Sequence, residues 1–448
     1  MSGTTSLLAI ALGICVGAET RQSPGTVLIV PQHDGWRSVS SVPAASLSSD
    51  GRWLAFESYA RLAPADTTSH CDVYVLDRTT GRVTLESITT DGDLLPGHST
   101  GPRLSGDGRY LVFETVIQAD DGMADGSEIV LRDRLQQTTK RVSRSPSSMP
   151  QAGRSRHPAI SDDGRMVVFA SSDTDLVAGR DENGQLEDVY LFDVATNRTR
   201  RISLDSRGVQ LADGASYMPS VNADGRYVAF TSTATLDGSP LRLLAGRPMA
   251  SVFVRDTRLG VTERVDVAAT GGAPDGPGRD PAISRDGRYV AFASDATNLV
   301  RGDRNRSADV FLRDLQNHVT TLISRGMSGS PANGPSGQPI VSGDGRFVAF
   351  QSLASDLICA RRCAAETEDI NLLWDVFRFD RLTGVMTRIS GESAGGWSEE
   401  SSSPQLDASG EIVAFSSRHP IDEQDVSNDF DVFVRIGTPA AASITRRH

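Results

Sequence analysis

The sequence is poor in lysine, cysteine and aromatic residues. Lysine occurs once, at Lys140, among 45 basic residues, and aromatic residues make up 6% of the 448 positions. The four cysteines form no CxxC pair and the seven histidines no HExxH motif, so the usual zinc spacings are absent. No glycine-rich phosphate-binding loop is present. The formal net charge of −12 disfavours a nucleic-acid partner.

Long apolar runs are also missing. The apolar stretch from Leu7 to Val16 is too short to span a bilayer, which takes about 20 residues. It is followed by Gly17-Ala18, a small-residue pair typical of a secretory cleavage site. We therefore expect residues 1–18 to be a signal peptide and 19–25 a linker. The protein is expected to be exported, periplasmic or extracellular, with no membrane span.

What the sequence does contain is one segment repeated seven times. Its core is Asp-Gly-Arg followed by an apolar run ending in Phe, as in SRDGRYVAFAS from Ser284. The turn glycines recur at spacings of 56 to 65 residues. They are Gly51, Gly108, Gly164, Gly225, Gly287, Gly345 and Gly410. A near-fixed period without helical periodicity indicates a radial or stacked repeat architecture.

Each copy holds four strand-like segments. Six copies have a proline six residues before the repeat glycine, which we interpret as the first residue of strand one because proline is tolerated there. Asp-Gly then predicts a tight hairpin turn into strand two. A segment such as DVFLRD from Asp309 predicts strand three, and VTTLIS from Val319 predicts strand four. Four antiparallel strands per repeat are typical of a β-propeller blade.

We therefore predict an all-β fold, a seven-bladed β-propeller of four-stranded antiparallel blades. It should occupy residues 26–437 as one domain, followed by a tail at 438–448. The seventh copy lacks a good fourth strand, and the segment Thr26 to Val30 has the spacing to supply it, with Ile444 to Arg447 as the rival. Pairing the N-terminal strand with the last blade would close the ring and remove a free edge. Six blades plus an irregular seventh unit is the alternative.

The Asp-Gly-Arg segment followed by DVFxxD resembles the PD40, or WD40-like, repeats of TolB-like propellers. The resemblance covers nearly the whole chain. It implies a β-propeller that is usually exported and often non-catalytic, and that serves as an interaction or ligand-binding platform. No α/β domain precedes the repeats, in contrast to TolB, so we do not expect a role in the Tol–Pal assembly.

Two charged positions of the repeat change together. Arginine opens strand two and aspartate closes strand three in six copies, whereas the seventh copy has Glu411 and Ile436 there. Antiparallel pairing places these positions side by side, which predicts a structural arginine–carboxylate pair in six blades. The pairs are Arg226–Asp256, Arg288–Asp314, Arg52–Asp77, Arg109–Asp133, Arg165–Asp193 and Arg346–Asp380.

The longer connections, between strands two and three and between strand four and the next blade, share one rim, called here the long-loop rim. Rigid scaffolds commonly carry function on such loops, so we expect a binding surface on this rim or at the mouth of the central channel. His98 and His157 lie in connections from strand four to strand one and are the candidate binding residues there. Each is equally compatible with a solvent-facing loop residue.

Oxygen-bearing side chains alternate in two loops of this rim, an arrangement that suits Ca²⁺. The complete loop of about twelve residues with its glycine and bidentate glutamate is absent, and Asp and Asn also cap loops through their own backbone. Ca²⁺ is therefore one of two interpretations. The residues are Asp303, Asn305 and Asp309 in one loop and Asp66, Thr68 and Asp72 in the other, and Asp181, Asn183 and Asp188 nearly repeat the spacing in a third.

Two further features carry open alternatives. Cys359 and Cys363 lie in a long loop of the sixth copy and could be bridged in an oxidising compartment or remain thiols. GESAG, from Gly391 to Gly395, matches the serine-hydrolase pattern, but that chemistry needs a strand–elbow–helix context. We assign no catalytic residue.

The leading functional hypothesis is a monomeric, non-catalytic, exported propeller that binds a protein, peptide or glycan through its long-loop rim. One alternative is an enzyme built in the channel, such as a polysaccharide lyase or hydrolase. Another is a stand-alone regulatory propeller of a peptidase system. Fold alone does not decide between them.

Overall fold

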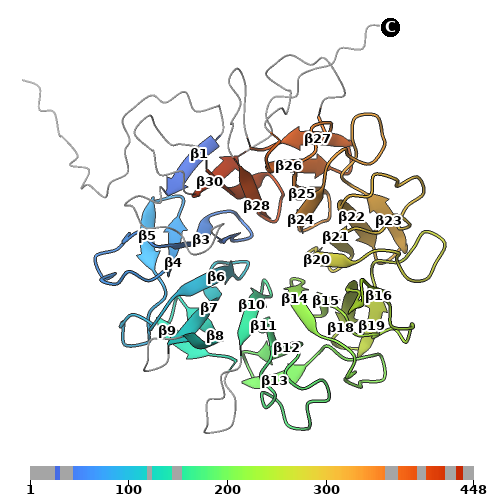
Figure 1. The fold of residues 1–448 in the computed structure, drawn as a ribbon. Helices are drawn as coiled ribbons and strands as arrows, with labels where there is room; N and C mark the ends of the chain where they lie inside the picture. The colour runs from blue at the N-terminus through green and yellow to red at the C-terminus, as the bar shows by residue number, and fades with distance from the viewer. Residues whose placement is uncertain are drawn as a thin grey trace, which may run out of the picture.

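The computed structural model describes residues 26–30, 44–118, 124–143, 154–358, 372–390, 400–418 and 430–436. The predicted signal peptide, linker and tail, the Cys359–Cys363 pair and Ser393 lie outside these ranges. Every regular element within them is a strand (Figure 1). None of these residues forms a helix that could cross a membrane.

Seven four-stranded antiparallel sheets surround a central axis (Figure 1), which confirms the predicted seven-bladed propeller and excludes the six-blade alternative. Blade 1 is β2 (Ala45–Leu47), β3 (Trp53–Ser58), β4 (Asp72–Asp77) and β5 (Arg82–Leu85). Blade 2 is β6 (Ser99–Leu104), β7 (Tyr110–Gln118), β8 (Ala124–Asp133) and β9 (Thr138–Arg141). Blade 3 is β10 (Ser155–Ile160), β11 (Met166–Ser171), β12 (Asp188–Asp193) and β13 (Arg198–Arg201).

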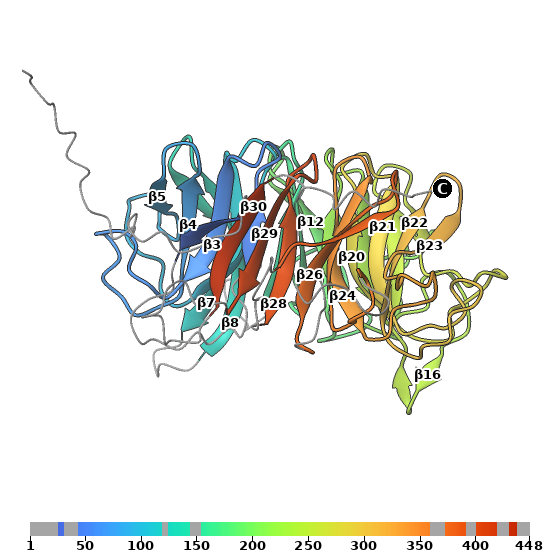
Figure 2. The same cartoon turned by 90° about the horizontal axis from the view of Figure 1, so that it is seen from above.

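Blade 4 is β14 (Ser216–Val221), β15 (Tyr227–Ser232), β18 (Ser251–Asp256) and β19 (Val261–Arg264). Blade 5 is β20 (Gly278–Ile283), β21 (Tyr289–Ser294), β22 (Asp309–Asp314) and β23 (Val319–Leu322), and blade 6 is β24 (Ser336–Val341), β25 (Phe347–Ser352), β26 (Asp375–Asp380) and β27 (Val385–Arg388). Blade 4 also carries a two-stranded hairpin, β16 (Leu243–Leu244) and β17 (Arg247–Pro248), which projects from the ring (Figure 2).

The N-terminal strand closes the ring. Blade 7 consists of β28 (Ser401–Leu406), β29 (Ile412–Ser417), β30 (Asp431–Ile436) and β1 (Thr26–Val30), in the order β1-β30-β29-β28. Thr26 lies opposite Arg435 and Leu28 opposite Phe433 in an antiparallel ladder. The first strand therefore completes the last blade, in the place that the fourth strand takes in every other blade.

A circle of backbone hydrogen bonds runs through the Asp-Gly turns, on what we call the short-turn rim. In each blade a turn N–H donates to a turn carbonyl of the next blade, at 2.8 to 3.4 Å, and blade 7 donates back to blade 1. The seven bonds are Ser49→Gly106, Gly106→Asp162, Asp163→Ala223, Ala223→Arg285, Asp286→Gly343, Gly343→Ala408 and Ala408→Ser49. Closure thus rests on the main chain as well as on β1.

The turn glycine is required by both backbone and packing. Gly345 has φ +73°, and a Cβ built there would lie 2.1 Å from Cδ2 of Tyr289 in the preceding blade. A residue with a side chain would therefore be strained and would also clash. This contact explains why Asp-Gly-Arg is followed by a large residue, since that residue packs under the turn of the next blade.

The hydrophobic core lies between the blades. Phe292 of β21 stacks on Phe311 of β22, with ring centroids 5.7 Å apart, and both are fully buried. One continuous cluster joins Val310 of blade 5 to Phe350 and Phe377 of blade 6. Because each blade covers the face of the next, neighbouring blades share a hydrophobic core, as a repeat fold requires.

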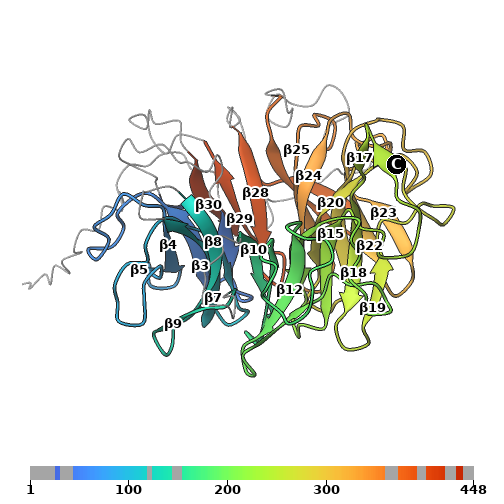
Figure 3. The ribbon, with the colours of Figure 1, turned by 60° about the horizontal axis from the view of Figure 1, so that its bottom comes forward.

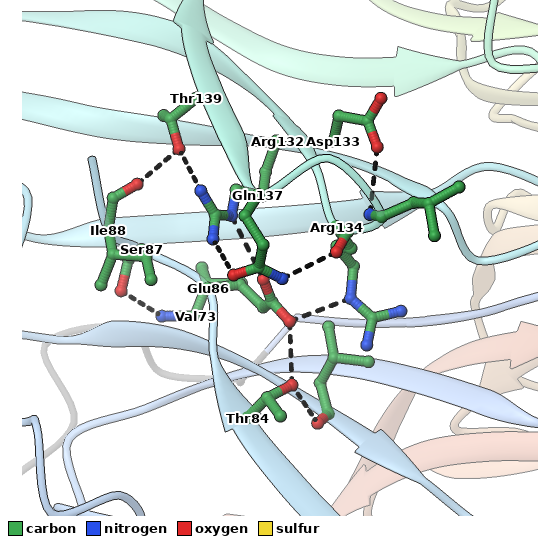
Figure 4. Close-up of polar contacts among 12 residues, drawn as sticks. Val73, Thr84, Glu86, Ser87, Ile88, Arg132, Asp133, Arg134, Gln137 and Thr139 are labelled. Carbon is green, nitrogen blue, oxygen red and sulfur yellow. Dashed lines mark hydrogen bonds and ion pairs between the residues drawn. The ribbon is translucent and has the colours of Figure 1, made fainter. Parts of the chain in front are cut away.

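A buried ionic cluster joins blades 1 and 2 (Figure 4). Glu86 is 4% exposed; it accepts a hydrogen bond from Nε of Arg134 at 2.9 Å and pairs with Nε of Arg132 at 3.4 Å. The fully buried Arg132 also donates to Gln137 and Thr139. Since these charges are paired and hydrogen-bonded, the cluster holds the blade interface without leaving an isolated buried charge.

Candidate binding site at the channel mouth

The proline of the innermost strand does not lie at the predicted position. It is the fourth residue of the strand rather than the first, as Pro281 is in β20. The pairing of β20 with β21 shifts register between Arg279 and Ala282, so the proline lies in a β-bulge. A bulge leaves residues unpaired, which is why the missing N–H of proline is tolerated inside the strand.

The residue before this proline has a left-handed backbone in six blades. Residues preceding proline normally adopt extended backbone, and a left-handed residue other than glycine costs about 1–2 kcal/mol. The same conformation recurs at glycine and at five residues with different side chains. The residues and their φ values are Gly101 (63°), His157 (54°), Met218 (51°), Asp280 (54°), Gln338 (47°) and Ser403 (53°).

These residues lie around the central axis. Strands β6, β10, β14, β20, β24 and β28 are the innermost strands, each paired within its blade on one side only (Figures 1 and 3). Two of the six residues contact the preceding blade. Gly101 N–H donates to Oε2 of Glu57 at 2.7 Å, and Oγ of Ser403 donates to Oε1 of Gln338 at 3.3 Å. The bulges therefore bring residues of neighbouring blades together around the channel.

An acidic group with a perturbed pKa lies beside this ring. The pKa of Glu114 is raised to about 7, mainly by burial and in part by the charges of Glu57 and Glu187, against the opposing effects of Ser127 and Arg156. Arg156 forms an ion pair with Glu187. Carboxyl groups of blades 1 and 3 thus act on Glu114 of blade 2, although the three residues are far apart in sequence.

The charged surface continues into blades 4 and 5. Burial raises the pKa of Tyr217, and the charges of Glu187 and Asp280 add to this effect. Arg279 pairs with Asp295 at 3.0 Å and lies 4.0 Å from Asp280. The mouth therefore brings together arginines, carboxylates and a tyrosine, of which Glu57 is buried. We call this set the mouth cluster: Glu57, Glu114, Arg156, His157, Glu187, Tyr217, Arg279 and Asp280.

The two candidate histidines have different environments. His157 lies in the ring; its buried Nδ1 has no hydrogen-bond partner in the described structure, and burial lowers its pKa. His98 instead accepts the N–H of Cys71 at its Nδ1 (2.9 Å) and contacts the rings of His70 and Tyr59. His98 is therefore engaged in local packing, and only His157 belongs to the mouth cluster.

The arginine–aspartate pairs lie on the opposite, short-turn rim. Arg226 and Asp256 are joined at 2.7 Å, as are Arg288 and Asp314. Arg52–Asp77, Arg109–Asp133 and Arg346–Asp380 are joined in the same way. In the described part of blade 3, no hydrogen bond or ion pair joins Arg165 to Asp193, whose carboxylate accepts backbone N–H groups of Ala195 and Thr196.

A groove of about 520 Å³ runs beside two of these pairs, between blades 4 and 5. It is lined by Arg226, Asp256 and Arg288 of these pairs together with Leu259, Val261 and His318. Because its arginines are already held by aspartates, we treat the groove as part of the blade interface. The mouth cluster is the better candidate site.

The structure also brings together the residues of each alternating-oxygen loop. Asn305 donates to Asp309 in blade 5, and Gln210 contacts Asp181, Asn183 and Asp188 in blade 3. Within the described ranges, no three His, Cys, Asp or Glu side chains form a group that could hold a metal ion. Any cation in these loops would need amide or carbonyl oxygens as well.

Comparison with known proteins supports the fold. No protein-family profile matches the chain, and no curated protein matches it. An oligogalacturonate lyase in complex with manganese matches with a TM-score of 0.53 at 13% identity, covering 93% of this chain and 97% of the lyase. The propeller domain of the trilobed protease from Pyrococcus furiosus matches with a TM-score of 0.50 at 12% identity, covering 88% and 94%.

TolB from Acinetobacter baumannii is also among the matching structures, with a TM-score of 0.40 and 13% identity over 88% of this chain and 80% of TolB. The matching propellers thus come from proteins with different activities. At such identities the likeness establishes the β-propeller fold and leaves the activity to be argued from the site itself.

Proposed function

We propose that this chain is an exported, non-catalytic β-propeller that binds a protein, a peptide or a glycan at the channel mouth on its long-loop rim. One observation carries the proposal: five residues other than glycine hold a left-handed backbone at the same place in the innermost strands. Such strain persists where the surrounding structure imposes it, and it gathers at functional sites. Here the strained backbone carries a different side chain in each blade.

The chemistry of the mouth cluster fits a polar ligand with groups of both charges. Arg156 and Arg279 are each half-exposed beside a carboxylate, so each can exchange part of its ion pair for a ligand group. Half-buried Tyr217 offers an apolar ring and a hydroxyl, a combination enriched at recognition surfaces. A protein or peptide segment would use the charges, and a glycan would use the ring and the hydrogen-bonding groups.

The test is a screen of the purified protein against peptide and glycan libraries, followed by a mouth variant. Tyr217→Ala combined with Arg279→Ala should weaken binding of any hit at least tenfold while leaving the fold intact. Arg258→Ala, an exposed arginine near the short-turn rim, is the matched control and should bind as the parent does. Hits that bind both variants equally would refute the proposed location.

Export is part of the same proposal. Expression of the complete chain in a bacterial host with an intact secretion system should yield protein beginning at Glu19 outside the cytoplasm. Retention of Met1 on a cytoplasmic product would contradict it.

A channel enzyme is the second candidate, and one observation favours it. A carboxyl group whose pKa is raised to about 7, as at Glu114, is suited to act as a general acid or base near neutral pH. His157, with its free Nδ1, belongs to the same cluster. A screen for cleavage of acidic oligosaccharides would identify such activity, and Glu114→Gln should abolish it. Turnover that survives Glu114→Gln would exclude this site as its origin.

A further inference from the structure

The loop between the second and third strands has the same acidic pattern in blades 1, 3 and 5. In each blade a loop aspartate lies close to the first aspartate of the third strand, and both carboxylates are buried. Two buried carboxylates repel each other and lose hydration, so they need donors or a cation nearby. The three blades differ in how this need is met. The loop and strand aspartates are Asp66 and Asp72, Asp181 and Asp188, and Asp303 and Asp309.

Blade 3 supplies the compensating groups from its own side chains. Arg201 on β13 contacts Asp181 at 2.9 Å and Asp188 at 3.2 Å. Nε2 of Gln210 lies 2.7 Å from Oδ1 of Asp181, 2.9 Å from Oδ1 of Asn183 and 2.7 Å from Oδ2 of Asp188. Three oxygens therefore converge on one nitrogen, in the arrangement they would adopt around a bound cation.

Blade 1 uses hydroxyl groups instead. The hydroxyl of Tyr74 on β4 donates to Oδ2 of Asp66 at 2.5 Å. The hydroxyl of Thr68 lies between Asp66 and Asp72, at 3.5 and 3.4 Å. The residue opposite Tyr74 on β5 is Leu85, where blade 3 has Arg201 opposite Tyr190. Blade 1 thus has no arginine at this position but satisfies its loop aspartate with a tyrosine.

Blade 5 has neither this arginine nor this tyrosine. Leu322 takes the place of the arginine, and Phe311, the residue opposite it, takes the place of the tyrosine. Asp309 accepts hydrogen bonds from Ser324 at 2.6 Å and from Nδ2 of Asn305 at 2.7 Å. Asp303 is only 7% exposed, yet its buried Oδ1 has no hydrogen-bond partner in the described structure.

Further negative charges lie around this pair of carboxylates. The charges of Asp303 and Asp356 both act on Asp309. The charge of Asp275 acts on Asp303, whose carboxylate also accepts a hydrogen bond from the N–H of Asn305. Among the residues that the structure describes, no arginine forms an ion pair with Asp303 or Asp309. In the described residues, the two carboxylates are therefore stabilised by hydrogen bonds from Ser324 and Asn305 but by no arginine.

We propose that blade 5 binds one calcium ion between Asp303 and Asp309. Rotation of the Asn305 side-chain amide by half a turn would break the hydrogen bond that its Oδ1 accepts from the N–H of Ser307. It would place that oxygen where Nδ2 now contacts Asp309 and the carbonyl oxygen of Ala332, at 2.7 and 3.0 Å. Two carboxylates, one amide and one carbonyl oxygen then surround the ion, and water completes its shell. An all-oxygen set of this kind suits Ca²⁺. This proposal stands independently of the ligand at the channel mouth.

Calorimetric titration of the full-length protein with CaCl₂ tests the site, with thermal unfolding measured in parallel. The parent should bind one ion and unfold at a higher temperature with Ca²⁺ present. Asp303→Asn should lower the affinity at least tenfold, whereas the matched variant Asp181→Asn, in the loop that Arg201 and Gln210 already fill, should bind Ca²⁺ as the parent does. Absence of Ca²⁺ binding by the parent, or equal losses in both variants, would overturn the proposal.

Two further variants introduce into blade 5 the side chains that stabilise the aspartates of blades 3 and 1. Leu322→Arg should place a guanidinium in the blade 5 site and abolish Ca²⁺ binding, although it also removes a buried leucine from the core. Phe311→Tyr should give Asp303 a hydroxyl partner, as Tyr74 gives Asp66, and weaken Ca²⁺ binding several-fold. If Leu322→Arg does not fold, Phe311→Tyr and Asp303→Asn decide the matter. Parent-like Ca²⁺ affinity in Phe311→Tyr and Asp303→Asn would refute the site.

Discussion

The two rims of this propeller use repetition differently. On the short-turn rim both the backbone and the side chains repeat: each turn has its glycine, each turn joins the hydrogen-bonded circle, and five blades have the arginine–aspartate pair. At the channel mouth only the backbone repeats, since the left-handed position carries six different residues. A position that repeats in both respects builds the ring, whereas one that repeats in backbone alone is available for recognition.

The largest effect is expected from Gly345→Ala on the short-turn rim. The new Cβ would lie 2.1 Å from Tyr289 at φ +73°, so overpacking and backbone strain together should cost about 3 kcal/mol of the free energy of unfolding. Gly81→Ala is the matched control, because its φ is +72° but no atom lies within 4 Å of the new Cβ. The control should lose only about 1 kcal/mol in denaturant titrations. Equal losses would show that blade packing does not depend on the turn.

The next effect concerns the pH dependence of stability at the mouth. The pKa of Glu114 is raised to about 7, above the usual value of an unfolded glutamate. A carboxyl group with a raised pKa stabilises the fold below its unfolded pKa, and this contribution is lost as the pH rises through about 7. Glu114→Gln should therefore flatten the fall in unfolding temperature between about pH 4.5 and 7. A variant with the same pH profile as the parent would contradict the burial of this carboxyl group.

The short-turn rim should respond to pH with the opposite sign. Hydrogen bonds from Arg288 lower the pKa of Asp314 to about 2, below its unfolded value. The pair therefore stabilises the fold above about pH 4, and this contribution is lost as the pH falls toward 2. The difference in unfolding temperature between the parent and Asp314→Asn should shrink over that interval. A constant difference would mean that the pair is not formed in solution.

The smallest effect is expected from relieving strain at the mouth. Gln338→Gly replaces an exposed side chain at φ 47°, so relief of strain should outweigh the entropy lost by glycine and stabilise the fold by about 0.5–1 kcal/mol. Gln316→Gly, at an exposed position with ordinary backbone, should instead destabilise it by about 0.5–1 kcal/mol. Denaturant titrations that give both variants the same sign would remove the evidence for strain at the mouth.

The fold could be predicted because its determinants are local. Asp-Gly turns, apolar second strands and the spacing of Thr26 to Val30 each specify one element and its neighbour. The bulge at Pro281 could not be predicted, because a residue before proline prefers extended backbone and only the packed ring imposes the left-handed conformation. In six copies, the proline six residues before the repeat glycine indicated the first strand of the blade. It did not indicate where in that strand the proline lies.

The mouth cluster was beyond sequence reasoning for a different reason. Glu114, Arg156 and Glu187 come from separate blades, and nothing in their spacing indicates that they converge. The same holds for Glu86 and Arg132 at the interface of blades 1 and 2. The acidic loops were visible from spacing, yet the difference between them depends on strand-four residues such as Leu322, whose relevance appears only when strands are paired.

The circle of turn-to-turn hydrogen bonds has a consequence for how the molecule comes apart. A linear array of repeats can fray from its ends, because a terminal unit has one neighbour. Here every wedge has two neighbours, so releasing any wedge must disrupt two junctions at once. Partial melting is correspondingly unfavourable, and loss of structure should be a single concerted event for the whole disc.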